Sequence, residues 1–205
     1  MSGRDRSPFL DALRDRVLVF DGAMGTSLQF EDPSIEDFGG KALEGWMDGL
    51  VLHAPQMVER IHRSFLDAGC DVLETSTFQA TRPRLEEWGQ SEVTRELNVS
   101  AARLARRLAD EYGAHDGRRR FVAGSMGPTG FLPASSDPSM SRLGFRDLVP
   151  VFLEQASALI EGGADVLIIE TQQDILETKA AVFGARTAIA GARRPVALMT
   201  TVSLD

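Results

Sequence analysis

Three carboxylates, Asp21, Glu74 and Glu170, each stand where an apolar, strand-like run of the sequence ends. The carboxyl ends of parallel strands meet at one edge of a sheet, and α/β enzymes build their active sites at that edge. Carboxylates that converge there can bind a substrate ammonium group, bind a hard cation, or serve as acid and base. A carboxylate that only caps the next helix or pairs with a local cation is the plainer interpretation, and it stays open for Glu74.

The turn after Asp21 carries a second signal. Gly22 and Gly25 allow the backbone to come close to a ligand, and successive amides from Gly22 through Ala23 and Met24 can hold a carboxylate. A similar turn, rich in glycine and proline, follows Ser125, whose hydroxyl can hydrogen-bond a ligand. Both turns therefore belong to the candidate site.

Other side-chain chemistry is scarce. His53, His62 and His115 are scattered, and none pairs with Cys70 at the spacing of a metal site. We expect His62 to be a surface or packing residue. Cys70 is the single cysteine, which excludes an intramolecular disulfide, and its place between small residues predicts a buried thiol.

Composition limits the remaining classes of function. The 205 residues are enough for one sizeable core, and the net charge of -8 argues against nucleic acid or an anionic membrane as the partner. No apolar run is long enough to span a bilayer, and the N-terminal residues lack the apolar core of a signal peptide. These features favour a cytoplasmic protein.

The elements that must position these residues alternate between strand and helix. Runs of apolar residues predict strands at Val17–Phe20, Cys70–Glu74, Phe121–Ser125, Ala164–Glu170 and Pro195–Thr201. We expect the first strand to be buried on both faces. Helices between the strands imply parallel pairing with right-handed crossovers.

Three apolar stripes at helical spacing predict the helices. Val58, Ile61, Phe65 and Ala68 form the first stripe. The second consists of Leu97, Ala101, Leu104, Ala105 and Leu108, with Ser91 as its expected N-cap, and the third of Phe152, Ala156, Leu159 and Ile160. A fourth helix opens on Asp174 and Glu177 as a capping box, and Leu176, Ala180, Phe183 and Thr187 are expected on its inner face.

A repeat in the sequence favours a barrel over an open sheet. Ala68–Thr75 matches Gly162–Thr171, and both segments end in Glu-Thr. No nucleotide-binding glycine motif is present. Two long loops, Phe30–Leu52 and Gly127–Ser141, follow strand ends, where a barrel forms its substrate pocket. We divide the chain into an N-terminal extension or first helix, 1–15, and a barrel segment, 16–205.

Four motifs in order resemble the homocysteine S-methyltransferase domain family, with the greatest likeness to the N-terminal module of cobalamin-dependent methionine synthases. They are Asp21–Thr26, Glu74–Phe78, Gly127–Thr129 and Asp165–Thr171. The likeness covers nearly all of the chain from Arg16. It implies a (β/α)8 TIM barrel, truncated here after about the fifth strand, and methyl transfer to the thiol of homocysteine, giving methionine.

The resemblance also implies roles for individual residues. Asp21 and Glu170 would hold the amino group of homocysteine, the backbone of Gly22, Ala23 and Met24 its carboxylate, and Thr75 and Ser76 would line the same mouth. We expect Glu74, Ser125 and Thr171 in the same substrate-binding site. In the family, zinc held by three cysteines binds the thiolate, and methylcobalamin is the expected methyl donor.

The chain departs from the family pattern at three places. Ser76 and Met47 each stand where asparagine is usual, and the family's zinc cysteines lie beyond Asp205. We therefore expect no metal ligands in this chain and no methyltransferase activity from it alone. The missing C-terminal barrel portion, or cobalamin and folate modules, would be its partners. A non-catalytic fragment or subunit that binds a small amino acid or a complementing chain, and another TIM-barrel enzyme that uses strand-end carboxylates, remain alternatives.

Overall fold

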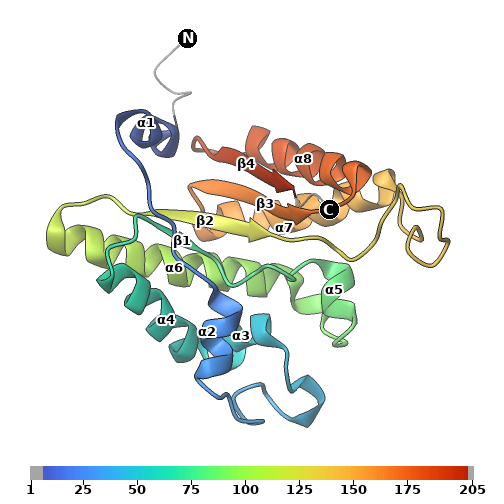
Figure 1. The fold of residues 1–205 in the computed structure, drawn as a ribbon, viewed down its shortest axis with the longest axis horizontal. Coiled ribbons are helices and arrows are strands. Elements are labelled where there is room, and N and C mark those ends of the chain that lie inside the picture. Colours follow the sequence, from blue (N-terminus) through green and yellow to red (C-terminus); the bar gives the residue numbers. More distant parts are fainter. Residues whose placement is uncertain (1–6, 203–205) are drawn as a thin grey trace.

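The structure is a computed structural model that describes residues 7–202. Its centre is a parallel sheet with the strand order β1-β2-β3-β4, as Figure 1 shows. The strands are β1 (Val72–Glu74), β2 (Phe121–Met126), β3 (Val166–Gln172) and β4 (Ala197–Val202). The predicted α/β class and the parallel pairing of consecutive strands are thus confirmed.

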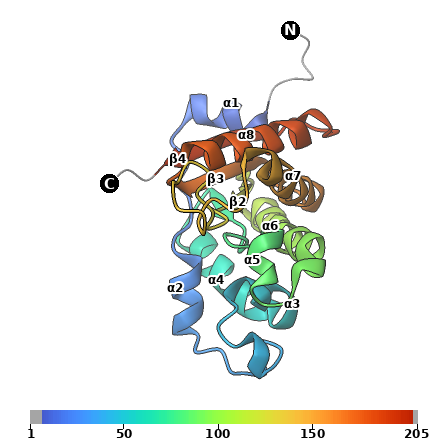
Figure 2. The same ribbon diagram turned by 90° about the vertical axis from the view of Figure 1, so that its right-hand side faces the viewer.

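Helices cover one face of this sheet. Figure 2 shows α6, α7 and α8 side by side along it. The helices are α1 (Pro8–Asp15), α2 (Met24–Phe30), α3 (Leu50–His53), α4 (Pro55–Asp67), α5 (Arg82–Glu86), α6 (Thr94–Asp116), α7 (Phe145–Gly162) and α8 (Ile175–Ala190), with short 3-10 turns at Lys41–Leu43, Met47–Gly49 and Ser91–Val93. Within residues 7–202, no helix is both long and apolar enough to cross a membrane.

The sheet has a separate core on each face, because side chains alternate along every strand. Leu73, Val122 and Leu167 pack against the helices in the larger core. Val72 and Phe121 point to the other face and form the smaller core. Phe9 of α1, Leu18, Ala123, Val166, Ile168 and Ala197 complete this smaller core. The Phe9 ring meets Phe121 edge to face, with 5.4 Å between ring centroids, so α1 closes the inner face near the strand starts.

The predicted first strand is only partly formed. Residues 17–20 make a single bridge, between Phe20 and Val72, and the side chains of Val17 and Val19 are 83% and 56% exposed. The expectation that this strand is buried on both faces is wrong. Leu18 turns inward and is buried, and Phe20 is partly buried against the same inner core. The outward side of the segment has no helix packed on it within the described residues.

The two copies of the sequence repeat each place an aspartate that hydrogen-bonds a neighbouring strand segment. Asp71 and Asp165 each precede a strand, and each accepts a hydrogen bond from the amide of a preceding strand segment. The Asp71 carboxylate binds the amide of Val19 and the Asp165 carboxylate that of Val122, both at 3.0 Å. The two carboxylates therefore tie each new strand to its neighbour.

Several helix predictions need correction. Helix α6 begins at Thr94 without a side-chain cap, and Ser91 lies in the preceding 3-10 turn. In α8, Asp174 caps the helix as expected, through the amides of Leu176 and Glu177. The Glu177 carboxylate does not complete the capping box, because it binds Thr129 instead.

The buried faces of two helices also differ from the expected ones. Ala180 is buried in α8, but Phe183 is 58% exposed and Thr187 is exposed. The contact face consists of the small residues Ala181, Gly184 and Ala185, which allow α7 to approach closely. Ala68 is likewise exposed, just after the end of α4, while Val58 and Ile61 are buried.

Candidate functional site

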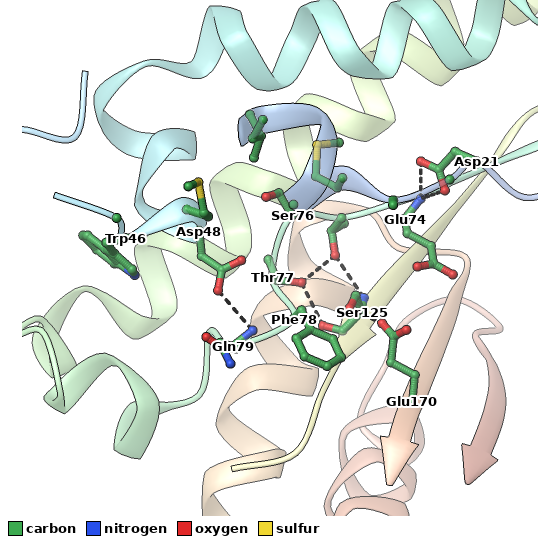
Figure 3. Close-up of a pocket in the computed structure, with 18 of the residues that line it drawn as sticks. Asp21, Trp46, Asp48, Glu74, Ser76, Thr77, Phe78, Gln79, Ser125 and Glu170 are labelled. Atoms are coloured by element: carbon green, nitrogen blue, oxygen red, sulfur yellow. Dashed lines mark hydrogen bonds between the residues drawn. The ribbon is translucent and has the colours of Figure 1, made fainter. Parts of the chain in front are cut away.

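A pocket of about 460 Å³ opens at the carboxyl ends of the strands. Figure 3 shows the side chains that line it and the hydrogen bonds between them. Of the predicted site residues, Asp21, Gly22, Ala23, Met24, Glu74, Thr75, Ser76, Ser125 and Glu170 line it, together with Gly25, Leu28, Gly45, Trp46, Met47, Asp48, Thr77, Phe78, Gln79 and Trp88. The site thus joins the first strand end, the long loop after it and the next strands.

Asp21 is held in place by its neighbour strand. Its side chain is 1% exposed, and both carboxylate oxygens accept from the amide of Glu74, at 3.1 and 3.0 Å. Burial raises the pKa of Asp21, an effect that the nearby His62 and the Glu74 amide oppose. The Nδ1 atom of His62 lies 3.8 Å from Oδ2 of Asp21, so this histidine is a buried neighbour of the site and not a surface residue.

Glu74, Ser125 and Glu170 occupy equivalent inward positions on successive strands. Each follows an apolar residue of the inner core by two positions: Val72, Ala123 and Ile168, respectively. The strand register staggers them, since Glu74 pairs with Ala123 and Ser125 with Ile168. Such a stagger between neighbouring strands is typical of barrels, and it places Glu74, Ser125 and Glu170 side by side around the opening of the pocket.

The pKa values of the Glu74 and Glu170 carboxyl groups are both raised in the pocket. Burial raises the pKa of Glu74 to about 8, and the charges of Glu170 and Asp21 act in the same direction. Burial also raises the pKa of Glu170, whereas a hydrogen bond donated by the Ser125 hydroxyl lowers it. Figure 3 shows the Glu74 and Glu170 carboxyl groups facing the same space. A cation bound there would relieve this repulsion.

The long loop after the first strand end supplies Asp48, which the sequence did not single out as a site residue. Its carboxylate accepts from the amide of Gln79 at 3.0 Å, and burial raises its pKa to about 7. Trp46, 3% exposed, lies beside it in the pocket wall (Figure 3). The only sequence signal for these residues was the position of a glycine-rich loop after a strand end.

A hydroxyl network stiffens the floor of the pocket. The hydroxyls of Thr75 and Thr77 are 2.6 Å apart, the Ser125 amide donates to the Thr75 hydroxyl, and the Thr77 hydroxyl donates to the Ser125 carbonyl. Gln155 of α7 donates to the Thr77 carbonyl at 3.0 Å. Thr75 therefore uses its hydroxyl inside the protein and contributes to the site mainly by positioning its neighbours.

Thr171 is the one predicted site residue that does not line the pocket. Its φ of 58° is in the left-handed region, which is unusual for a β-branched residue, and the register between β3 and β4 shifts at this point. Its amide donates to the hydroxyl of Thr201 at 3.2 Å. The kink ends the regular run of the strand directly after Glu170.

Acidic side chains dominate the charged lining of the pocket. Asp21, Asp48, Glu74 and Glu170 line it, and no lysine or arginine does so among the described residues. No group of three or more His, Cys, Asp or Glu side chains in residues 7–202 is arranged to hold a metal ion. The Cys70 thiol is buried, and burial raises its pKa to about 12.

Comparisons with known proteins agree with the geometry. Residues 18–205 match the family described as homocysteine S-methyltransferase. This chain belongs to that family. It is 40% identical over 167 residues to methionine synthase from Mycobacterium tuberculosis, a match that covers 82% of this chain and 13% of that protein.

Solved structures support the fold. The homocysteine methyltransferase MmuM from Escherichia coli matches in its metallated form with a TM-score of 0.71 and 24% identity, over 90% of this chain and 64% of that one. Its oxidized form matches with a TM-score of 0.71 and 25% identity, over 63% of its length. The chain therefore spans less than two thirds of these relatives. The expected resemblance, and the assignment of the sheet to a partial TIM-barrel-like fold, are confirmed.

Proposed function

We propose that this chain forms the amino-acid-binding part of an enzyme that transfers a methyl group to the thiol of homocysteine, giving methionine. The observation that carries the proposal is a pocket lined by four carboxylates and, among the described residues, by no basic side chain. Such a pocket attracts an ammonium group, which homocysteine presents beside its carboxylate. Membership in the homocysteine S-methyltransferase family supplies the substrate class.

The two ends of the amino acid would be recognised by different parts of the pocket. Asp21 and Glu170 would flank the ammonium group. The amides of Gly22, Ala23 and Met24, in the turn that leads into α2, would bind the carboxylate. The backbone at Gly22 packs closely against Phe65, because a Cβ at this position would lie 3.0 Å from the Phe65 ring. Ser76 is shorter than the usual asparagine, so its contact with the substrate would be lost or would run through water.

The thiol must be activated by groups that the described residues do not supply. A zinc ion held by three cysteines, as in the family, would stabilise the thiolate when bound. The residues present do not fit such a site, because Cys70 is the only cysteine of the sequence and its thiol is buried. We assign this chain no step in thiol activation. Methylcobalamin as donor, the rest of the barrel with cobalamin and folate modules as partners, and a cytoplasmic location belong to the same proposal.

Calorimetry with homocysteine tests the proposal most directly. Glu74, with a pKa of about 8, holds its proton in much of the protein at pH 7.5. An ammonium group placed beside it favours the carboxylate, so binding should release protons. The apparent binding enthalpy should therefore differ between HEPES and Tris buffers of the same pH. The compound 4-mercaptobutanoate, which is homocysteine without its amino group, should not bind.

Single substitutions distinguish recognition by the pocket carboxylates from a general effect of the protein's negative charge on homocysteine binding. Asp21→Asn and Glu170→Gln should each weaken homocysteine binding about tenfold or more, because each removes a charged partner of the ammonium group. Asp137→Asn, which removes an exposed carboxylate from the loop after β2, is the matched control and should bind normally. Equal binding of homocysteine and 4-mercaptobutanoate would contradict the proposed recognition.

A further inference from the structure

A second cavity, of about 330 Å³, lies at the opposite end of the strands from the carboxylate pocket. It is formed where α6, the segment before β2, the turn before β3 and the segment before β4 come together, at the strand starts in Figure 1. Four of the eight residues that line it are arginines and two are aspartates. They are Arg106, Arg119, Arg120 and Arg194, with Asp110, Asp165, Ala109 and Gly163.

Two of these guanidinium groups are fixed by the backbone before any ligand arrives. Arg106 lies across Gly163, where a Cβ would come within 3.0 Å of its side chain, and it donates to the carbonyl of Arg120 at 3.2 Å. Arg194 donates to the carbonyl of Ala164 at 2.5 Å. Groups held in this way lose little conformational entropy when they bind a ligand.

The carboxylates nearby leave part of the positive charge uncompensated. Asp165 makes one close ion pair, with Arg106 at 2.7 Å, whereas its distances to Arg194 and Arg119 are 3.8 and 4.0 Å. Asp110 also forms an ion pair with Arg106, and Arg120 forms its ion pair with Asp116, which does not line the cavity. Arg119 and Arg194 therefore have no close carboxylate partner among the described residues.

The uncompensated positive charge of the cavity also affects the pKa of Arg194. Burial lowers the pKa of its guanidinium, Asp165 opposes the shift, and the positive charges of Arg106 and Arg119 add to it. The chain as a whole carries a net charge of -8, so the basic cavity is a local feature of an acidic protein. An anion placed between the three arginines would meet donors that now repel one another.

We propose that this arginine pocket binds a phosphate-sized dianion, either free phosphate or the phosphate group of a small ligand. Guanidinium groups offer paired N–H donors that match the oxygens of a phosphate. The space between these four segments of chain suits a compact anion that enters from solvent, and its place at the strand starts separates it from the proposed homocysteine site. Asp165 stays paired with Arg106 and the Val122 amide, so Arg119 and Arg194 are the guanidinium groups left to meet the ligand.

The test is a titration of the protein with inorganic phosphate, followed by calorimetry and by 31P line broadening, with ionic strength held constant by NaCl. Saturable binding is expected. Arg119→Gln should weaken it about tenfold, because one charged donor pair is lost, and Arg119→Lys should weaken it less. Arg103→Gln is the matched control. Like Arg119, Arg103 is an exposed arginine with one distant carboxylate, at 3.7 Å, and its replacement should not change the affinity.

The outcomes distinguish the sources of the anion. Competition by glycerol 3-phosphate would support a phosphate group carried on a larger molecule, and binding of inorganic phosphate alone would support the free ion. Absence of saturation, or equal losses in Arg119→Gln and Arg103→Gln, would overturn the proposal. So would binding of an acidic peptide such as hexaglutamate without any binding of phosphate, since that result would indicate a protein-docking surface.

Discussion

At the scale of single residues, the strand-end rule located the acidic pocket well. Asp21, Glu74 and Glu170 could be placed together from the sequence because the carboxyl ends of parallel strands share one edge. Asp48 and Trp46 could not, since their positions depend on how a long loop packs against distant helices. For His62 the sequence allowed a surface or a packing position; the structure shows the packing position, and its place facing Asp21 depends on how the helix packs.

The buried carboxyl of Glu74 predicts a specific dependence of stability on pH. Its pKa is about 8, above the ordinary value of 4.5, so the folded protein keeps a proton that the unfolded chain releases between these values. The unfolded state then binds fewer protons, and the free energy of unfolding falls as the pH rises from about 4.5 to about 8. Glu74→Gln should flatten this decline and stabilise the protein at pH 8. Urea unfolding at several pH values measures it, with the exposed Glu86→Gln as control; an unchanged slope in Glu74→Gln would contradict the assignment.

Thr171 predicts a second effect at this scale. A β-branched residue with φ of 58° is strained, whereas asparagine adopts this region readily. Thr171→Asn should raise the free energy of unfolding by about 1 kcal/mol. Thr171→Val keeps the branched Cβ and should bring no gain. Thermal unfolding of the two variants checks the pair, and equal midpoints would show that the backbone there is not strained.

At the scale of elements, the loop after β2 is fastened to α8 by two buried carboxylates. Glu177 accepts from the Thr129 amide at 2.7 Å and from its hydroxyl, and Asp174 accepts from the Ala134 amide at 2.8 Å. The capping motif at the start of α8 was visible in the sequence. That its second carboxylate would serve the loop instead was not, because local spacing does not reveal a contact between residues 48 positions apart.

Removal of this fastening should free the loop. Glu177→Ala leaves the buried Thr129 amide without its partner, which costs about 1–3 kcal/mol. We expect proteolytic cleavage within 130–141 to become faster than in the parent protein. Glu161→Ala, which removes an exposed glutamate from the neighbouring α7, should leave the cleavage rate unchanged. Similar rates in both variants would mean that Glu177 does not hold the loop.

At the scale of the whole molecule, the class, the parallel order and the repeat were predictable, because buried strands and helix stripes have distinct periods. The partial first strand was not, since Val17–Phe20 reads as apolar whether or not anything packs on its outer side. The packing of α1 was also missed: the sequence assigned residues 1–15 to an extension or first helix without a core residue, yet Phe9 is completely buried in the inner core. Residues 1–6 of that extension lie outside the described residues.

Phe9 therefore predicts a large effect from a short terminal helix. Phe9→Ala should lower the free energy of unfolding by about 3–5 kcal/mol, because it empties a site between Phe20 and Phe121. Leu10→Ala, at a neighbouring position that is 43% exposed, should change it by about 0.5 kcal/mol or less. Chemical denaturation compares them. Equal losses would indicate that α1 contributes by helix formation and not by closing the inner core.

The paired tethers at Asp71 and Asp165 bear on how the polypeptide is made. Each strand lies beside the one that precedes it in the chain. The Asp71 and Asp165 carboxylates each bind a segment that is synthesised earlier than the strand they precede. Assembly can thus follow synthesis, one unit added to the edge of the last. Ribosome-bound chains of increasing length should gain protease resistance in steps, with Asp165→Asn delaying the step at β3 and leaving the earlier ones in place.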